Sequence, residues 1–213
     1  MSDLSKTDDL FFNRAGMDLE RVECLAEDAL NGADDGELYL EYCQSESVHF
    51  DDGQLKNASY NTSQGFGLRA VCGEVTGYSH ASELSEEAIK RAAETVKTVH
   101  TGQSGKMSTP PAGTNSQLYT DDNPLSLVEF ETKVKLLTDM DAYARSKDER
   151  VAQVSASLSG SWQAVQVLRP DGMRAADIRP LVRLNVTVMV AKGDRMEAGS
   201  YGAGAVSYTH LRA

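Results

Sequence analysis

The chain has 213 residues, of which 40% are hydrophobic and 25% charged, a composition close to that of ordinary globular proteins that argues against disorder along its whole length. It contains 21 Lys and Arg against 32 Asp and Glu, which gives a net charge of -11. No basic cluster could follow a phosphate backbone, so the sequence disfavours direct nucleic-acid binding.

Membrane and secretory signals do not stand out in the sequence. No run of eighteen apolar residues occurs, and the N-terminal segment MSDLSKTDDL is acidic and polar where a secretory signal would be basic and then apolar. The three cysteines, Cys24, Cys43 and Cys72, are widely spaced and odd in number, unlike a disulfide framework or a CxxC metal site. We therefore expect a cytoplasmic protein whose cysteines are reduced and serve in packing, with a reactive thiol as the alternative role.

A helix followed by a sheet is predicted after an N-terminal tail over residues 1–16. Residues 17–30 place apolar side chains at three- and four-residue spacing, which is typical of a helix with one buried face. From Glu37 the pattern has period two, and the Asp52-Gly53 dipeptide is a strong hairpin signal. The expected strands, which short turns such as Gly73-Glu74 join into an antiparallel meander, cover residues 37–42, 47–50, 54–60, 66–72 and 76–81.

Two further helices are predicted on either side of an exposed connection. Ser85 can cap the first of them. Its apolar face, expected to pack on the meander, contains Ala88, Ile89, Ala92, Ala93, Val96 and Val99. Residues 101–125 are rich in Gly, Ser, Thr and Pro, which indicates the exposed connection. The segment Ser126-Leu127-Val128-Glu129 has the form of a capping box that opens a long helix.

A second antiparallel set of strands is expected from Val151 onward. The period returns to two over residues 151–158, 162–168, 173–178 and 181–191, with turns at Gly160, Asp171-Gly172 and Gly193-Asp194. The predicted fold class is α+β, with antiparallel meander sheets packed with helices. Along the chain we expect a helix-meander-helix part at residues 17–100, the connection at 101–125, and the long helix with the second strand set at 126–205.

The C-terminal segment 206–213, VSYTHLRA, looks like one reading frame of a sequencing-library adaptor. We therefore expect it to be a non-native tail, outside the fold. In that case the natural protein continues beyond Ala205, and the sequence is a truncated fragment.

Short motifs do not identify a cofactor site or a nucleophile. Residues 64–69 contain a GxG pattern but lack the third glycine of a dinucleotide site, so these glycines are expected to permit close backbone approach or a bend within a strand. No GxSxG elbow surrounds Ser157. The acidic pairs Asp51-Asp52 and Asp121-Asp122 fall in predicted turns, where solvation explains them.

Histidines give no metal site in the pattern of the sequence. Outside the adaptor-like tail, His49, His80 and His100 are far apart and lie in no HExxH or HExxxH arrangement. We assign no catalytic, metal-binding or cofactor-binding residue, and no substrate-binding residue can be named.

Several segments, taken in order, resemble the N-terminal domain of the TldD/PmbA family, whose members also carry the label modulator of DNA gyrase. They span nearly all of residues 10–205 and look more like the TldD branch than the PmbA (TldE) branch. Their order and spacing together carry the resemblance. The segments are ELYL (37–40), SYN (59–61), QGFGLRA (64–70), GEVTGY (73–78), LYT (118–120), SASLSG (155–160) and ADIRPLVRL (176–184).

The resemblance implies a cytoplasmic zinc-dependent peptidase that pairs with a TldE/PmbA-like subunit and cleaves extended or unfolded peptides. The family holds zinc with two His of an HExxxH helix and a later Cys, and the Glu of the helix activates water. No position of this sequence matches those residues. The zinc would belong to the full-length protein, and we expect the fragment to bind none and to be inactive.

Two other functions remain as alternatives. The complete protein could be a non-catalytic TldE/PmbA-like partner or peptide-binding subunit, or a regulator of gyrase, although the net charge of -11 speaks against DNA contact. The predicted sheets could also bind an extended peptide at an edge by strand addition.

Overall fold

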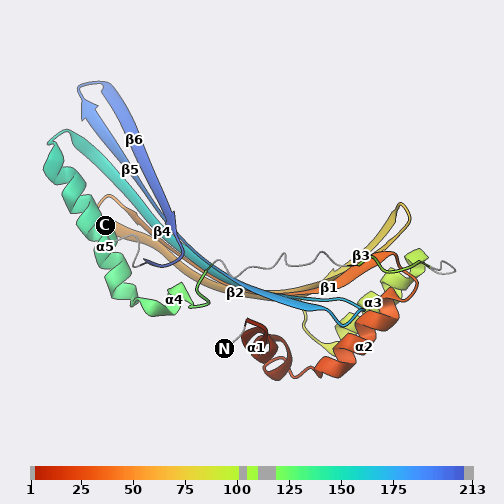
Figure 1. The fold of residues 1–213 in the computed structure, drawn as a ribbon. Helices are drawn as coiled ribbons and strands as arrows, with labels where there is room; N and C mark the ends of the chain where they lie inside the picture. Colours follow the sequence, from red (N-terminus) through yellow and green to blue (C-terminus); the bar gives the residue numbers. More distant parts are fainter. Residues whose placement is uncertain (1–2, 101–104, 110–118, 209–213) are drawn as a thin grey trace. The chain divides into compact units, whose positions relative to one another are not determined.

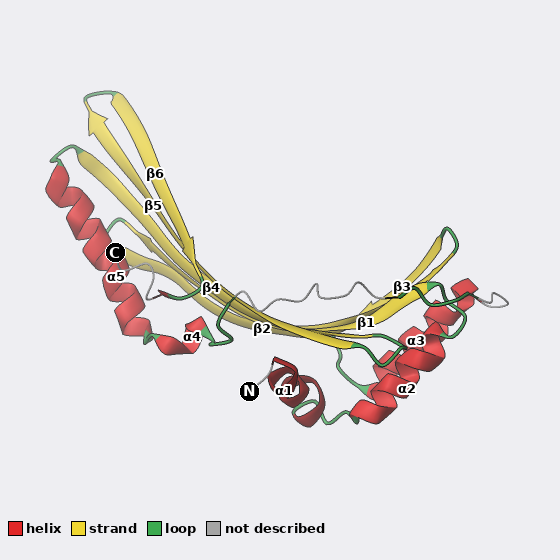
Figure 2. Ribbon diagram, viewed as in Figure 1, coloured by secondary structure: helices red, strands yellow, loops and turns green. Residues whose placement is uncertain are grey.

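The computed structural model of the chain describes residues 3–100, 105–109 and 119–208, which form one six-stranded sheet with helices (Figures 1 and 2). The strand order β3-β2-β1-β4-β5-β6 joins two antiparallel meanders where β1 pairs with β4, which confirms the predicted α+β class. The strands are β1 Asp35–Asp51, β2 Gln54–Cys72, β3 Val75–Ala81, β4 Val151–Leu168, β5 Arg174–Lys192 and β6 Arg195–Ala205. The helical elements are α1 Asp3–Asp8, the π-helical η1 Asp9–Asn13, α2 Leu19–Leu30, α3 Glu86–His100, α4 Pro124–Leu127 and α5 Phe130–Lys147.

Two compact units make up the chain, and neither is continuous in sequence. The first comprises Met1–Cys43, Ser63–Leu118 and Gln163–Ile178, and the second comprises Gln44–Thr62, Tyr119–Trp162 and Arg179–Ala213. Strands β1, β2, β4 and β5 contribute residues to both units. The consecutive parts expected at 17–100 and 126–205 therefore differ from these units, and that division along the chain stays a prediction. Within the described ranges, none of the helices has both the length and the hydropathy of a membrane span.

In the first unit, helices α2 and α3 cover one face of the sheet. Leu38 and Leu40 of β1 point into this core together with Phe66 and Leu68 of β2, because alternate residues of a strand share a face. The apolar helix faces predicted from the sequence are buried there: Val22, Ala26, Ala29, Leu30, Ala88, Ile89, Ala92, Ala93 and Val96. The side chain of Val99 lies outside the described residues. Ser85 caps α3 as predicted, since its Oγ accepts a hydrogen bond from the Ala88 amide at 3.1 Å.

The N-terminal tail expected over residues 1–16 is helical from Asp3 to Asn13. Phe11 and Phe12 are 0% and 5% exposed and belong to the core of the first unit. Two adjacent aromatic residues have no helical periodicity of their own, which is why the sequence pattern does not predict this packing.

In the second unit, α4 and α5 pack on one face of the sheet. Its core consists of Val48, Phe50, Leu125, Leu137, Ala156, Leu158, Val182, Leu184 and Tyr208. The capping box predicted at Ser126 is wrong. The long helix α5 begins at Phe130 after Glu129, which makes no side-chain cap, and Asn123 instead caps the short α4 through its Oδ1, 3.0 Å from the Leu125 amide. The proline after Asn123 is suited to the first turn of a helix, so the chain forms a short helix before the long one.

The strands are longer than the sequence predicts, and the turn expected at Gly160 is wrong. Gly160 lies inside β4, where a Cβ would come within 2.7 Å of Leu125 Cδ2. The glycine therefore makes room for packing on the sheet instead of reversing the chain. The turns predicted at Gly73-Glu74, Asp171-Gly172 and Gly193-Asp194 are confirmed, whereas Asp121-Asp122 forms no turn. At Asp52-Gly53 both residues have positive φ, 50° and 76°, as the tightest hairpin turns require.

Tyr208 lies within the segment expected to be a non-native tail, yet it is 4% exposed and packs in the core of the second unit. The expectation that the whole segment stays outside the fold is therefore wrong for this residue, because its ring fills the space above Gly160. The adaptor origin of the segment stays a prediction.

Candidate functional site

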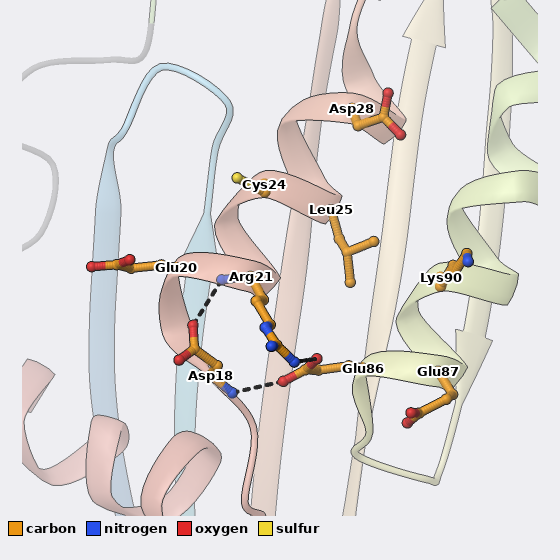
Figure 3. Close-up of a pocket in the computed structure, with 9 residues that line it drawn as sticks. All are labelled: Asp18, Glu20, Arg21, Cys24, Leu25, Asp28, Glu86, Glu87 and Lys90. Atoms are coloured by element: carbon orange, nitrogen blue, oxygen red, sulfur yellow. Dashed lines mark hydrogen bonds and ion pairs between the residues drawn. The ribbon is translucent and has the colours of Figure 1, made fainter.

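An open groove of about 770 Å³ lies between α2 and α3 in the first unit (Figure 3). Asp18 caps α2 by accepting a hydrogen bond from the Arg21 amide at 3.0 Å, while its own amide donates to Glu86 Oε1 at 2.9 Å. Glu86 also faces the Arg21 guanidinium at 3.5 Å. The polar groups of this groove thus cap a helix and connect two helices, which is a structural role.

A smaller cleft of about 360 Å³ lies in the first unit, with lining residues from β1, β2 and β3. Tyr39 and Glu41 of β1 alternate with the buried Leu38 and Leu40, so they lie on the face of the sheet opposite to the helices. On β3, His80 stands opposite Gly67 of β2, which brings Tyr78 and His80 to the same face. The cleft therefore gathers two tyrosines, a histidine and a carboxylate.

Two glycines of β2 shape the floor of this cleft. A Cβ on Gly67 would lie 2.7 Å from Tyr78 Oη and 3.1 Å from its ring, so the tyrosine lies over the bare backbone. A Cβ on Gly65 would lie 2.6 Å from the carbonyl oxygen of Ala81. The prediction that these glycines permit close backbone approach is confirmed. The rings of Tyr78 and His80 stack with centroids 5.6 Å apart.

Two neutral side chains donate hydrogen bonds to the carboxylate of Glu41. Tyr39 Oη donates to Glu41 Oε2 at 2.7 Å, and Gln163 Nε2 donates to the same oxygen at 2.8 Å. Burial raises the pKa of the nearby Cys43 thiol, and the charge of Glu41 raises it further. Cys43 is therefore a poor nucleophile.

Two carboxylates on the same face of β1, nearer to the start of the strand than Glu41, are paired with guanidinium groups. Arg69 Nε lies 2.7 Å from Glu37 Oε1, and Arg69 Nη2 lies 2.9 Å from Asp35 Oδ2. Asp35 also faces Arg169 Nη1 at 2.8 Å. The hydrogen bond to Glu37 raises the pKa of Arg69 and outweighs the opposite effect of burial. This network holds the start of β1 to β2 and to the residue that follows β4.

The histidines and cysteines whose side chains the structure describes build no metal site with their described neighbours. His49 lies in β1 and His80 in β3, while the side chain of His100, at the end of α3, lies outside the described residues. Within the ranges 3–100, 105–109 and 119–208, no group of three His, Cys, Asp or Glu side chains could hold a metal ion. The described residues therefore do not fit the zinc that the sequence resemblance implies.

The remaining motif residues have structural surroundings. Ser157 lies in the middle of β4. Asp51 accepts hydrogen bonds from Gln153 Nε2 at 3.0 and 3.2 Å, and Asp52 pairs with Arg145. Sequence reasoning missed the cleft lined by Tyr39, Glu41, Tyr78 and His80. The sequence does hold a signal for it. Tyr39 and Glu41 lie two positions apart around an apolar residue, and Tyr78 and His80 lie two positions apart around a small one, so each pair shares one face of its strand.

The chain matches two consecutive family models: the PmbA/TldA metallopeptidase domain 1 over residues 36–99 and the central domain over residues 123–210. It is 38% identical over 174 residues to a protein of Haemophilus influenzae named Metalloprotease TldD homolog, covering 80% of this chain and 36% of that protein. The chain thus spans about a third of the length of this relative.

Solved structures of the same fold are much less similar in sequence. A protein of Thermotoga maritima titled a putative modulator of a DNA gyrase superposes with a TM-score of 0.70 at 16% identity, over 94% of this chain and 45% of that chain. TldE from Thermococcus kodakarensis superposes with a TM-score of 0.67 at 17% identity, over 89% of this chain and 43% of that chain. At these identities the likeness shows the fold alone.

Proposed function

The chain belongs to the PmbA/TldD metallopeptidase family, and from this membership we propose that it is part of a TldD-type zinc-dependent peptidase. With a TldE/PmbA-like partner, the peptidase cleaves extended or unfolded peptides in the cytoplasm. The observation that carries the proposal is the 38% identity to a Metalloprotease TldD homolog over most of the chain.

The contribution of this chain is to bind and position, because the part that the structure describes lacks a group of metal ligands. Hydrolysis by a metallopeptidase needs such a group to hold the metal. The ligands therefore come from residues other than the described ones, and we expect this chain alone to be inactive.

Edge strands give the chain a way to hold an extended peptide. Among the described residues, strand β6 pairs with β5 alone, and residues 195–202 are exposed on both faces. An added peptide strand would bond to the free backbone groups of β6 regardless of its side chains, which suits a peptidase for unfolded substrates. Amide hydrogen exchange of β6 with and without an unfolded peptide tests this role, and unchanged exchange rates would count against it.

The proposal is tested by comparing the 213-residue chain with the product of the complete gene, each with and without its TldE/PmbA-like partner and zinc. Release of fluorescent peptides from labelled casein is the readout. The complete protein with its partner and zinc should show turnover that a chelator abolishes, whereas the 213-residue chain should show none. Zinc-dependent turnover by the chain alone would overturn the assignment of the metal ligands to other residues.

The alternative is a non-catalytic TldE/PmbA-like subunit, because the two family models that the chain matches cover the PmbA branch as well as the TldD branch. The complete gene separates the two: one that encodes an HExxxH segment supports the peptidase, and one without it supports the partner subunit. A role in gyrase regulation is disfavoured by the net charge of -11, and a salt-dependent gel shift of DNA by the complete protein would revive it.

A further inference from the structure

The cleft of the first unit, lined by Tyr39, Glu41, Gly67, Tyr78 and His80, contains a negative charge that faces no cation among its lining residues. No Lys or Arg contributes to the described wall of the cleft. The carboxylate of Glu41 is held by the neutral Tyr39 and Gln163, at 2.7 and 2.8 Å. Asp35 and Glu37, on the same face of β1, are already paired with guanidinium groups.

The aromatic walls of the cleft add to this attraction for a cation. The faces of tyrosine rings carry partial negative charge, and a cation within about 6 Å of a ring centroid is stabilised by it. Tyr78 is 62% exposed, and its ring lies over Gly67. The cleft that Tyr78 and Glu41 both line has a volume of about 360 Å³, which leaves room for a planar or slender group beside the ring.

We propose that this cleft binds an organic cation, an ammonium or guanidinium group, carried by a peptide. The carboxylate of Glu41 would accept hydrogen bonds from the cation, and Tyr78 would cover it. The peptide nature of the ligand rests on the proposed function, whereas the preference for a cation rests on the cleft alone.

The groove between α2 and α3 is more acidic but a poorer candidate for the same ligand. Of its five carboxylates, Glu86 faces Arg21 at 3.5 Å and Asp28 lies 2.5 Å from Lys97 Nζ. Lys90 lines the same groove. Arg21, Lys90 and Lys97 thus place three cations at or next to its carboxylates, whereas no Lys or Arg lines the cleft around Glu41.

The test is a titration of the isotopically labelled 213-residue chain, followed through the amide resonances of Gly65 and Gly67. The probes are Ac-Gly-Arg-Gly-NH2, the same peptide with neutral citrulline for arginine, Gly-Ala-Gly-NH2 with its free amino terminus, and ethylguanidinium chloride. The arginine peptide should bind at least about tenfold more tightly than the citrulline peptide, and the third probe tells whether a terminal ammonium serves as well as a side chain.

Three variants separate charge from structure. Glu41→Gln keeps an acceptor for Tyr39 and Gln163 but removes the charge, and should weaken binding of the arginine peptide at least about tenfold. Tyr78→Leu should weaken it several-fold through loss of the ring face. Glu83→Gln, an exposed carboxylate that pairs with Arg91 at 3.3 Å, is the matched control and should leave binding unchanged.

Equal affinity of the citrulline peptide, or unchanged binding by a folded Glu41→Gln variant, overturns the proposal. Shifts confined to residues of the groove between α2 and α3 overturn it as well. If ethylguanidinium binds as tightly as the arginine peptide and depends on Glu41, the cation site stands and the peptide function loses support.

Discussion

Glu46 of β1 and Lys133 of α5 form an ion pair that is almost sealed from solvent in the second unit. Lys133 Nζ lies 2.5 Å from Glu46 Oε1 and 2.9 Å from the carbonyl oxygen of Leu125, and the side chains of Lys133 and Glu46 are 3% and 12% exposed. Such a pair repays the cost of removing two charges from water only while both partners are present.

Removal of one partner should therefore destabilise the chain strongly. Glu46→Gln leaves the Lys133 ammonium buried without a counter-charge, and we expect a loss of about 3–5 kcal/mol in the free energy of unfolding. The triple variant Glu46→Leu, Lys133→Met and Tyr208→Phe, which also removes the buried hydroxyl that donates to Glu46, should recover most of it. Urea unfolding followed by circular dichroism measures both. Asp139→Asn, which breaks the exposed pair with Lys135, is the control and should change stability by less than about 0.5 kcal/mol.

The side-chain cap of the short helix α4, which precedes α5, gives a second prediction. Asn123→Ala removes the Oδ1 that accepts from the Leu125 amide at 3.0 Å and the Nδ2 that donates to Gln44 at 2.6 Å. We expect a loss of about 1 kcal/mol in the free energy of unfolding, from the same urea titration. Ser126→Ala should cost less, because Ser126 Oγ donates only to the Asn123 carbonyl. A larger effect at Ser126 than at Asn123 would restore the capping box.

The sequence predicts correctly those elements that neighbouring residues determine, and it misses those that depend on contacts between distant residues. The turn at Asp52-Gly53 and the cap at Ser85 are set by neighbouring residues and were predicted. Gly160 looks like a turn residue, but its role depends on Leu125, which lies far along the chain. The burial of Phe11 and Phe12 likewise depends on contacts across the first unit, which no periodicity reveals.

The cleft could be predicted in part. The turn predicted at Gly73-Glu74 fixes the register that sets Gly67 opposite His80, so the β3 wall follows from local sequence. The surroundings of Glu41 do not, because Gln163 lies 122 positions further along the chain. The family resemblance was carried by ordered segments, and the match to both family domains confirms it.

The two glycines of the cleft should respond differently to alanine. At Gly65 the new Cβ meets the backbone carbonyl of Ala81 at 2.6 Å, so strand β3 must move, and we expect a loss of about 1–3 kcal/mol. At Gly67 it meets the exposed Tyr78 side chain, which can swing aside at a cost below about 1 kcal/mol. Thermal and urea unfolding of both variants measure this difference. Equal losses would show that Tyr78 is held as firmly as the backbone.

Acid should weaken the network around Asp35. Burial acts to raise the pKa of Asp35, but hydrogen bonds from Arg169 and Arg69 outweigh it and hold the pKa below the ordinary 3.8. A carboxyl whose pKa is lowered on folding stabilises the protein above its unfolded pKa, and this contribution is lost as pH falls through the folded value.

Asp35→Asn should therefore be less stable than the unchanged chain at about pH 7. This gap, the difference between their free energies of unfolding, should shrink as the pH falls below about 4. Urea midpoints measured across that range give the gap at each pH. Glu83→Gln serves as the control, because its side chain is 61% exposed and its pair with Arg91 is screened by solvent. A gap for Asp35→Asn that stays constant down to about pH 2 would mean that the stability comes from packing at this position, since protonation of Asp35 would then remove nothing.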